Sequence, residues 1–186
     1  LTMSHSEQEA HKVSVPGRIC LAGENIDWIS GPVLTAALDS LRTTVQATSR
    51  TKQQVFVQYG QPYNTSDLFE IHKTYNYGRE STDYVKAVIA TLYKSGYQIE
   101  GLNLDIQSNL PVSGGLASSG SFCVALVAAA NLHFELGMDN EKIAETAFIA
   151  EKEEMGIGCG QMDQYAVALG GLLYLNCSTK PPEIQK

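Results

Sequence analysis

The 186-residue sequence lacks the features that mark several large classes of protein. Its apolar run at residues 122–132 falls short of the roughly 20 residues that a membrane-spanning helix needs. Its formal net charge is -7, without the basic excess that a nucleic-acid-binding face requires. Its four cysteines form no C-x-x-C pair or metal-ligand spacing, and its four histidines are scattered. We therefore expect no membrane span, no nucleic-acid partner and a reduced, intracellular chain.

The composition is that of a folded domain. Hydrophobic residues make up 44% of the chain and charged residues 18%, which supplies a core and argues against a disordered chain. The first residues are polar, without the apolar segment of a signal peptide, so we expect a soluble cytoplasmic protein. We predict a flexible leader at 1–12, one domain at 13–177, and a linker or truncated end at 178–186.

Hydrophobic periodicity predicts a mixture of strands and helices within this domain. The expected strands are 12–15, 19–22, 43–47, 55–59, 102–108 and 172–176. The expected helices are 83–95, 119–136, 140–153 and 160–169, with a variable surface connection at 60–80. Strands and helices do not alternate strictly, so the sequence predicts an α+β domain with two layers rather than a doubly wound parallel sheet.

The most informative segment is rich in glycine and serine and joins a predicted strand to a predicted helix at residues 110–121. Glycine lets backbone approach a ligand closely, and the N–H groups of such a loop and of the helix start attract phosphate. The segment contains neither the Gly-Lys-Ser/Thr of a Walker A loop nor the G-x-G-x-x-G of a dinucleotide-binding fold. The alternative is an ordinary turn with a serine helix cap.

The pattern P-x-x-x-G-L-x-S-S at residues 111–119 resembles the second motif of the GHMP kinases. Residues 15–28 resemble the first motif in its galactokinase form, and residues 150–164 resemble the segment that carries the catalytic aspartate. The resemblance covers residues 13–176 and implies the N-terminal, ATP-binding domain of that family. The implied fold is a mixed sheet backed by helices, like ribosomal protein S5 domain 2.

The resemblance extends no further than this domain. Family members have a C-terminal domain with a third glycine-rich motif, and these 186 residues contain no such motif. We expect a fragment of a longer protein, with a separate second chain or a degenerate relative as the alternatives.

The resemblance implies ATP and Mg²⁺ as cofactors, bound by the glycine-serine loop and its neighbours. The implied ATP-binding residues are Pro111, Ser113, Gly114, Gly115, Leu116, Ala117, Ser118, Ser119 and Gly120. The implied Mg²⁺ ligands are Ser119 and Glu151. Without the resemblance, Ser119 is a helix N-cap and Glu151 belongs to a charged run that faces water.

The resemblance implies that Asp163 and Arg18 are catalytic. Asp163 would accept the proton of the acceptor hydroxyl or anchor that hydroxyl. A neighbouring Arg18 guanidinium would lower the pKa of Asp163 and neutralise charge on the transferring phosphoryl group. The alternatives are a first-turn aspartate that interacts with the helix dipole and a surface salt bridge of little energetic consequence.

The implied sugar-binding residues are Glu24, Asn25, Asp27 and Gly160. Two carboxylates three residues apart suit a polyol, although such a pair also fits a helix start. The family usually has His where this chain has Asn25, and Tyr where it has Trp28, which puts galactose itself in doubt. We expect the side chain of Trp28 in the core, with a sugar-stacking role as the alternative.

We therefore expect an ATP-dependent sugar kinase that phosphorylates a monosaccharide hydroxyl, the C1 hydroxyl by resemblance to galactokinase. The expected partners are the sugar and ATP, together with a C-terminal GHMP domain in the full-length protein. Two alternatives stay open: a GHMP kinase for a non-sugar acceptor, and a non-catalytic sugar or ATP sensor that keeps the fold. Because a lone domain leaves the phosphates open to water, we expect weak or no turnover from this chain alone.

Overall fold

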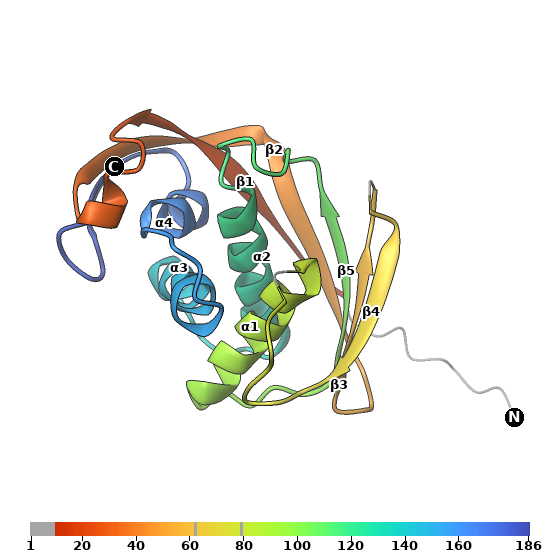
Figure 1. Cartoon of the computed structure of the whole chain (residues 1–186). Coiled ribbons are helices and arrows are strands. Elements are labelled where there is room, and N and C mark those ends of the chain that lie inside the picture. Colours follow the sequence, from red (N-terminus) through yellow and green to blue (C-terminus); the bar gives the residue numbers. More distant parts are fainter. Residues whose placement is uncertain (1–9, 62, 79) are drawn as a thin grey trace, which may run out of the picture.

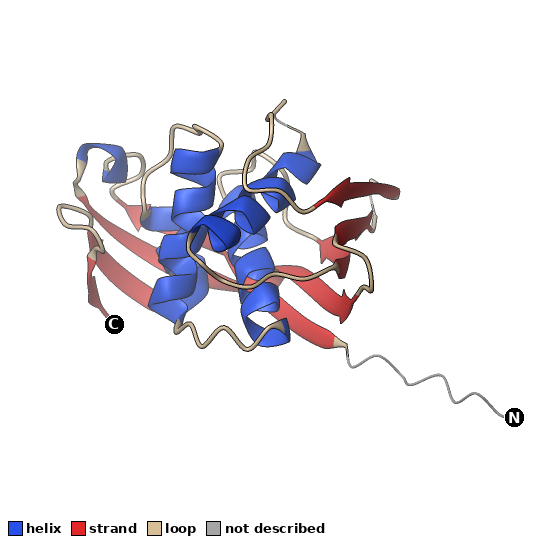
Figure 2. Cartoon of the chain, turned by 90° about the horizontal axis from the view of Figure 1, so that it is seen from below, coloured by secondary structure: helices blue, strands red, loops and turns tan. Residues whose placement is uncertain are grey.

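The computed structural model describes residues 10–61, 63–78 and 80–186, and these form two layers. A curved sheet makes one layer and the helices cover one of its faces (Figure 1). The view from below shows the same helices packed side by side against the sheet (Figure 2). The predicted α+β architecture is confirmed.

The described residues form a 7-stranded sheet with the order β4-β3-β5-β2-β6-β7 and with β1 paired to β2. Its strands are β1 (His11–Ala22), β2 (Pro32–Ser49), β3 (Gln54–Tyr59), β4 (Thr65–Glu70), β5 (Leu102–Ser108), β6 (Leu172–Asn176) and β7 (Glu183–Gln185). The β3–β5 pair is parallel and the other pairs are antiparallel, so the sheet is mixed. The long β2 pairs with β5 along its second half and with β6 along its first half.

The pairing of β1 with β2 shifts register between Pro16 and Gly17, and this shift changes which side chains of β1 are buried. Val15 is buried before the shift, and the consecutive residues Gly17 and Arg18 are both buried after it. Side chains alternate between faces along a regular strand, so two consecutive buried residues mark a break in that regularity. The shift turns a charged side chain into the layer between sheet and helices. The sequence predicted two separate strands here, and the structure has one.

The helical layer is built around α2, which is buried along most of its length. It consists of α1 (Ser81–Lys94), α2 (Ser118–His133), α3 (Asn140–Ile149) and α4 (Met162–Leu169), with a 3₁₀ turn η1 (Asp27–Ile29) and a π-helical turn η2 (Ala150–Glu154). The helix predicted over 140–153 is therefore α3 continued by η2. Small and apolar side chains make α2 suitable for burial on every side. No helix of the described residues is long and apolar enough to cross a membrane.

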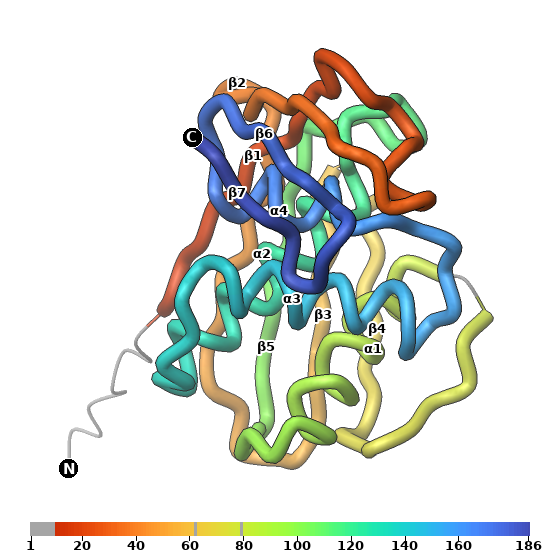
Figure 3. Tube along the Cα trace, turned by 90° about the vertical axis from the view of Figure 1, so that its left-hand side faces the viewer, coloured from red at the N-terminus to blue at the C-terminus, as the bar shows by residue number. Residues whose placement is uncertain are grey.

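Several segments differ from the prediction. The strand expected at 43–47 begins at Pro32 as β2, and the connection expected at 60–80 contains β4, which pairs with β3. The first strand begins at His11, inside the segment expected as a leader, and residues 1–9 lie outside the described part of the chain. The segment 178–186, expected as a linker or end, contains β7, which pairs with β6. The tube view shows this last segment folded back along the sheet beside β6 (Figure 3).

Candidate active site

The glycine-serine loop lies directly before α2 and is held from behind by Arg18. Ser113, Gly115 and Ala117 have positive φ of 57°, 68° and 58°. Left-handed residues at every second position turn the intervening N–H groups toward a common concavity. The backbone N–H of Arg18 donates to Leu116 O at 3.1 Å, and its Nη1 donates to Gly115 O at 2.7 Å. The loop therefore has the backbone shape of an anion-binding turn.

The predicted ATP-binding residues form one continuous segment that leads into α2, with Ala117 and Gly120 buried. Pro111 to Gly115 are exposed, and the chain enters the helix at Ser118. Gly120 lies against the helix of Asp163, where a Cβ at position 120 would come within 2.9 Å of Asp163 Cβ. The start of α2 thus touches the start of α4, which brings the loop and the aspartate together.

A cavity of about 460 Å³ opens beside this loop, and the sequence did not reveal it. Aromatic rings line much of it, namely Tyr59, Tyr63, Tyr84 and Phe122. Phe122 lies 6.4 Å from Tyr59 and 6.1 Å from Tyr84, measured between ring centroids. The rings come from a strand end, a loop and two helices, so no local pattern marks them. Its apolar walls suit a flat heterocycle.

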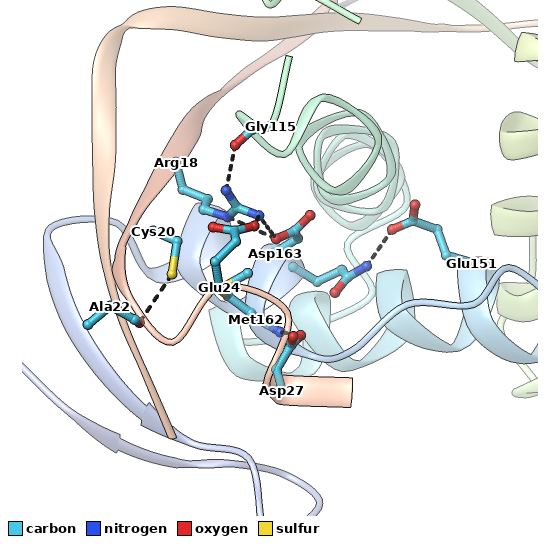
Figure 4. A network of polar contacts seen from close by, with 10 residues as sticks. Arg18, Cys20, Ala22, Glu24, Asp27, Gly115, Glu151, Met162 and Asp163 are labelled. Atoms are coloured by element: carbon cyan, nitrogen blue, oxygen red, sulfur yellow. Dashed lines mark hydrogen bonds and ion pairs between the residues drawn. The ribbon is translucent and has the colours of Figure 1, made fainter. Parts of the chain in front are cut away.

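Arg18 and Asp163 form an ion pair at the base of the loop (Figure 4). Arg18 Nε and Nη2 both donate to Asp163 Oδ1, at 2.9 and 2.5 Å. The Arg18 side chain is 4% exposed and that of Asp163 is 29% exposed. Burial raises the pKa of Asp163 above its ordinary value, and Arg18 only partly opposes this rise. The predicted pair is present, whereas the predicted lowering of the pKa is wrong because desolvation outweighs the guanidinium.

Asp27 is buried beneath the same site. Its Oδ2 accepts the backbone N–H of Met162 at 3.1 Å, and its Oδ1 has no hydrogen-bond partner among the described residues. Gly160 makes room for this carboxylate, because a Cβ there would fall 1.9 Å from Asp27 Oδ2. Asp27 therefore fixes the start of α4 with one oxygen, while its other oxygen has no partner among the described residues.

The other residues predicted for sugar binding lie on the exposed rim. Glu24 Oε1 is 3.6 Å from Arg18 Nη2, and the Glu24 side chain is 49% exposed. Asn25 is exposed with φ of 64°. Trp28 is 59% exposed, so its predicted core position is wrong. Asp27 and Trp28 are neighbours in the 3₁₀ turn η1. The side chain of Asp27 points inward from this turn, so the indole of Trp28 lies in solvent.

Glu151 is the most deeply buried acidic side chain of the site. The π-helical turn η2 leaves Glu151 at 1% exposure while its neighbours Lys152 and Glu153 are exposed. The alternative that Glu151 faces water is therefore excluded. Gln164 Nε2 donates to Glu151 Oε2 at 2.5 Å, and the Ser119 hydroxyl is a second hydrogen-bond partner. Burial raises the pKa of Glu151 to about 7.

The surroundings of Glu151 fit a hard divalent cation. Among the ion pairs of the described residues, none brings a Lys, Arg or His to Glu151. A buried carboxylate without a cation is costly, and a bound cation would offset that cost. Carboxylate and hydroxyl oxygens are the ligands that Mg²⁺ prefers. No group of three or more His, Cys, Asp or Glu suited to a metal occurs in the described parts of the chain, so phosphate or water would complete the coordination.

Comparison with known families and proteins agrees with this geometry. The GHMP kinases N terminal domain matches residues 83–171, and the galactokinase galactose-binding signature matches residues 3–48. Galactokinase of Pyrococcus furiosus is 36% identical over 172 residues, which cover 90% of this chain and 47% of that protein. Galactokinase of Thermococcus kodakarensis is 35% identical over 86% of this chain and 44% of that protein.

Solved structures of GHMP kinases have a fold similar to that of this chain. Lactococcus lactis galactokinase complexed with galactose aligns with a TM-score of 0.87 and 27% identity, over 95% of this chain and 47% of that chain. Methanococcus jannaschii mevalonate kinase shares the fold, with a TM-score of 0.80 and 19% identity over 97% of this chain and 56% of that chain. The chain spans about half the length of the curated relatives it matches.

Proposed function

Because the chain belongs to the GHMP kinase family, we propose that its protein transfers the γ-phosphoryl group of Mg·ATP to a monosaccharide hydroxyl. The observation that carries the proposal is the Arg18–Asp163 ion pair, which lies between the glycine-serine loop and the carboxylates of Glu24 and Asp27. A phosphate cradle, a charged pair and a polyol-binding pair of acids are the parts that phosphoryl transfer to a sugar requires.

The triphosphate would bind to the loop at residues 111–120, whose N–H groups and helix start favour negative charge. The aromatic cavity beside the loop would take the adenine ring. Ser119 and Glu151 would hold Mg²⁺. When bound, this cation would neutralise part of the phosphate charge. The Ser119–Glu151 hydrogen bond supports this assignment, because it brings the two oxygen ligands together before any cation is present.

Asp163 would hold the acceptor hydroxyl in line with the γ-phosphate and accept its proton as the O–P bond forms. Its raised pKa supports a role in proton transfer, since a carboxylate with a higher pKa is a better base. Arg18 would keep Asp163 ionised and neutralise the charge that develops on the phosphoryl oxygens. The hydrogen bond from Arg18 to Gly115 O joins both groups to the loop.

The acceptor would bind across Glu24, Asn25, Asp27 and the backbone of Gly160. The free Asp27 Oδ1 is a buried acceptor that a sugar hydroxyl can satisfy. The match of residues 3–48 to a galactose-binding signature makes galactose the first candidate. The C1 hydroxyl is the first candidate position only by the resemblance to galactokinase. Since the matched relatives are about twice as long, we expect the remainder of the longer protein to cover the phosphates.

The test is ADP release with Mg·ATP across a panel of monosaccharides, for this chain and for the longer protein. Turnover with one sugar in the longer protein, lost in Asp163→Asn and retained in Asp39→Asn, is the expected result. Asp39 provides a matched control because its side chain is fully exposed on β2 and belongs to a surface pair with Arg42. ATP binding without turnover on any sugar would contradict the proposal and favour a sensor, and turnover with a non-sugar acceptor would replace the substrate class.

A further inference from the structure

Gln164 occupies a position that packing does not explain. It is 1% exposed, yet its amide makes a single side-chain hydrogen bond, from Nε2 to Glu151 Oε2. Its Oε1 is buried without a partner among the described residues. A half-satisfied polar pair in a core is less stable than apolar side chains of the same volume. The pair is therefore better explained by function than by stability.

The carboxylate of Glu151 determines which way the amide of Gln164 points. When Glu151 is ionised, as a cation ligand must be, its carboxylate only accepts hydrogen bonds, so the NH₂ group must face it. The amide in turn holds one carboxylate oxygen, while the Ser119 hydroxyl contacts the same carboxyl group. Two donors of fixed origin leave the Glu151 side chain in one orientation.

The backbone on both sides of this contact is also fixed. Gln164 follows Asp163 on α4, and Glu151 lies in η2, which packs against α1. At the far end of η2, Glu154 accepts from Tyr77 Oη at 2.7 Å and pairs with Lys94 Nζ. The amide of Gln164 therefore holds the Glu151 side chain from α4, an element other than η2.

We propose that Gln164 is a positioning residue, which orients Glu151 for a divalent cation and links the cation site to the helix that carries Asp163. This inference rests on the proposed function, because it takes Glu151 as a cation ligand. Residues that hydrogen-bond to a metal ligand set its orientation, and their loss commonly weakens metal binding by about 10- to 100-fold. Adjacent positions on α4 would then serve the metal and the acceptor hydroxyl respectively.

The matched control is Gln161, another buried glutamine on the same helix start. Its Nε2 donates to Thr179 O at 3.1 Å and has no contact with Glu151 in the described structure. Gln164→Met and Gln161→Met each replace a buried amide by an apolar side chain of similar length. Gln164→Asn keeps the amide but shortens its reach.

The experiment measures free Mn²⁺ by electron paramagnetic resonance in the presence of a non-hydrolysable ATP analogue, together with the thermal midpoint of each variant. We expect Gln164→Met and Gln164→Asn to weaken Mn²⁺ binding by about tenfold or more, with Gln161→Met at the wild-type affinity. If Gln164→Met does not fold, the Mn²⁺ affinity of Gln164→Asn alone tests the inference.

Three results would overturn the inference, and they differ in what they say of the proposed function. Wild-type Mn²⁺ affinity in a folded Gln164 variant would remove the positioning role and leave the cation site intact. An equal loss in Gln161→Met would assign the effect to general packing. Failure of the wild-type chain to bind Mn²⁺ with the nucleotide would reject the cation site itself, and the inference with it.

Discussion

The carboxylates of Asp163 and Glu151, which both lie beside α2, differ in where their countercharge comes from. Asp163 has an internal cation, because two nitrogens of Arg18 donate to it. Glu151 has only a glutamine amide and a serine hydroxyl, although it is the more deeply buried of the two. A fold that buries a charge without a partner leaves that charge available to a ligand. The comparison supports the proposal that Asp163 serves proton transfer and that Glu151 binds a cation.

The largest effect is expected from removing the internal partner. Asp163→Ala leaves the Arg18 cation buried, with Glu24 as its nearest remaining anion at 3.6 Å. We expect the free energy of unfolding to fall by about 3–5 kcal/mol, measured by urea denaturation. The double variant Arg18→Met/Asp163→Ala removes the stranded charge and should recover part of the loss. A cost below about 1 kcal/mol in the single variant would contradict the buried pair.

The second effect concerns Glu151 and pH. Its pKa is about 7 in the fold against 4.5 ordinarily, so between these values the folded state binds more protons than the unfolded state. The free energy of unfolding should therefore fall as pH rises from about 4.5 to about 7, by on the order of 3 kcal/mol, and change little above that.

Glu151→Gln isolates this contribution, because the raised pKa of Asp163 adds a slope of the same sign. Urea denaturation at pH 5 and pH 8 should show a smaller decrease for Glu151→Gln than for wild type. Equal decreases in the two proteins would place the titrating group elsewhere.

A smaller effect is expected at the glycine beside Asp27. Gly160→Ala places a Cβ against the Asp27 carboxylate and must displace it, at a cost of about 1–3 kcal/mol. Gly158→Ala is the matched control, since its Cβ would meet only the Trp28 ring at 3.6 Å, an ordinary contact. Chemical denaturation should separate the two variants. Equal free energies of unfolding for Gly160→Ala and Gly158→Ala would show that the Asp27 carboxylate moves aside at little cost.

The smallest effect on stability is expected on the exposed rim. Glu24→Gln removes a half-exposed partner of Arg18, which is worth at most about 1 kcal/mol. We expect an almost unchanged free energy of unfolding, together with a raised KM for the sugar in the longer protein. An unchanged KM would remove Glu24 from the acceptor site and restrict that site to Asn25, Asp27 and Gly160.

Hydrophobic periodicity in the sequence predicted the α+β class. The resemblance of three short motifs to the GHMP kinases implied that Arg18, Asp163 and the glycine-serine loop share one site. The burial of Arg18 was beyond prediction, since it depends on a register shift against β2. The raised pKa of Asp163 results from its burial by several elements. The spacing of residues in the sequence does not indicate that burial.

The same limit applies at Glu151 and Trp28. A charged run predicts a helix face in water, and only the π-helical turn η2 and its packing on α1 bury Glu151. The sequence predicted a core position for the single tryptophan, Trp28. In the structure, Asp27 is the buried residue of the η1 turn and Trp28 is exposed. Gln164 carried no signal in the sequence, because its importance lies in one contact with a residue of another helix.

The most direct test of the account asks whether an external cation supplies the missing countercharge of Glu151. The thermal midpoint of the chain would be measured at pH 8 with a non-hydrolysable ATP analogue, with and without Mg²⁺, for wild type, Glu151→Gln and Asp39→Asn. The account predicts Mg²⁺-dependent stabilisation of wild type and Asp39→Asn, about 2.7 kcal/mol at a concentration of 100 Kd, and its loss in Glu151→Gln. Equal stabilisation of all three proteins would contradict it.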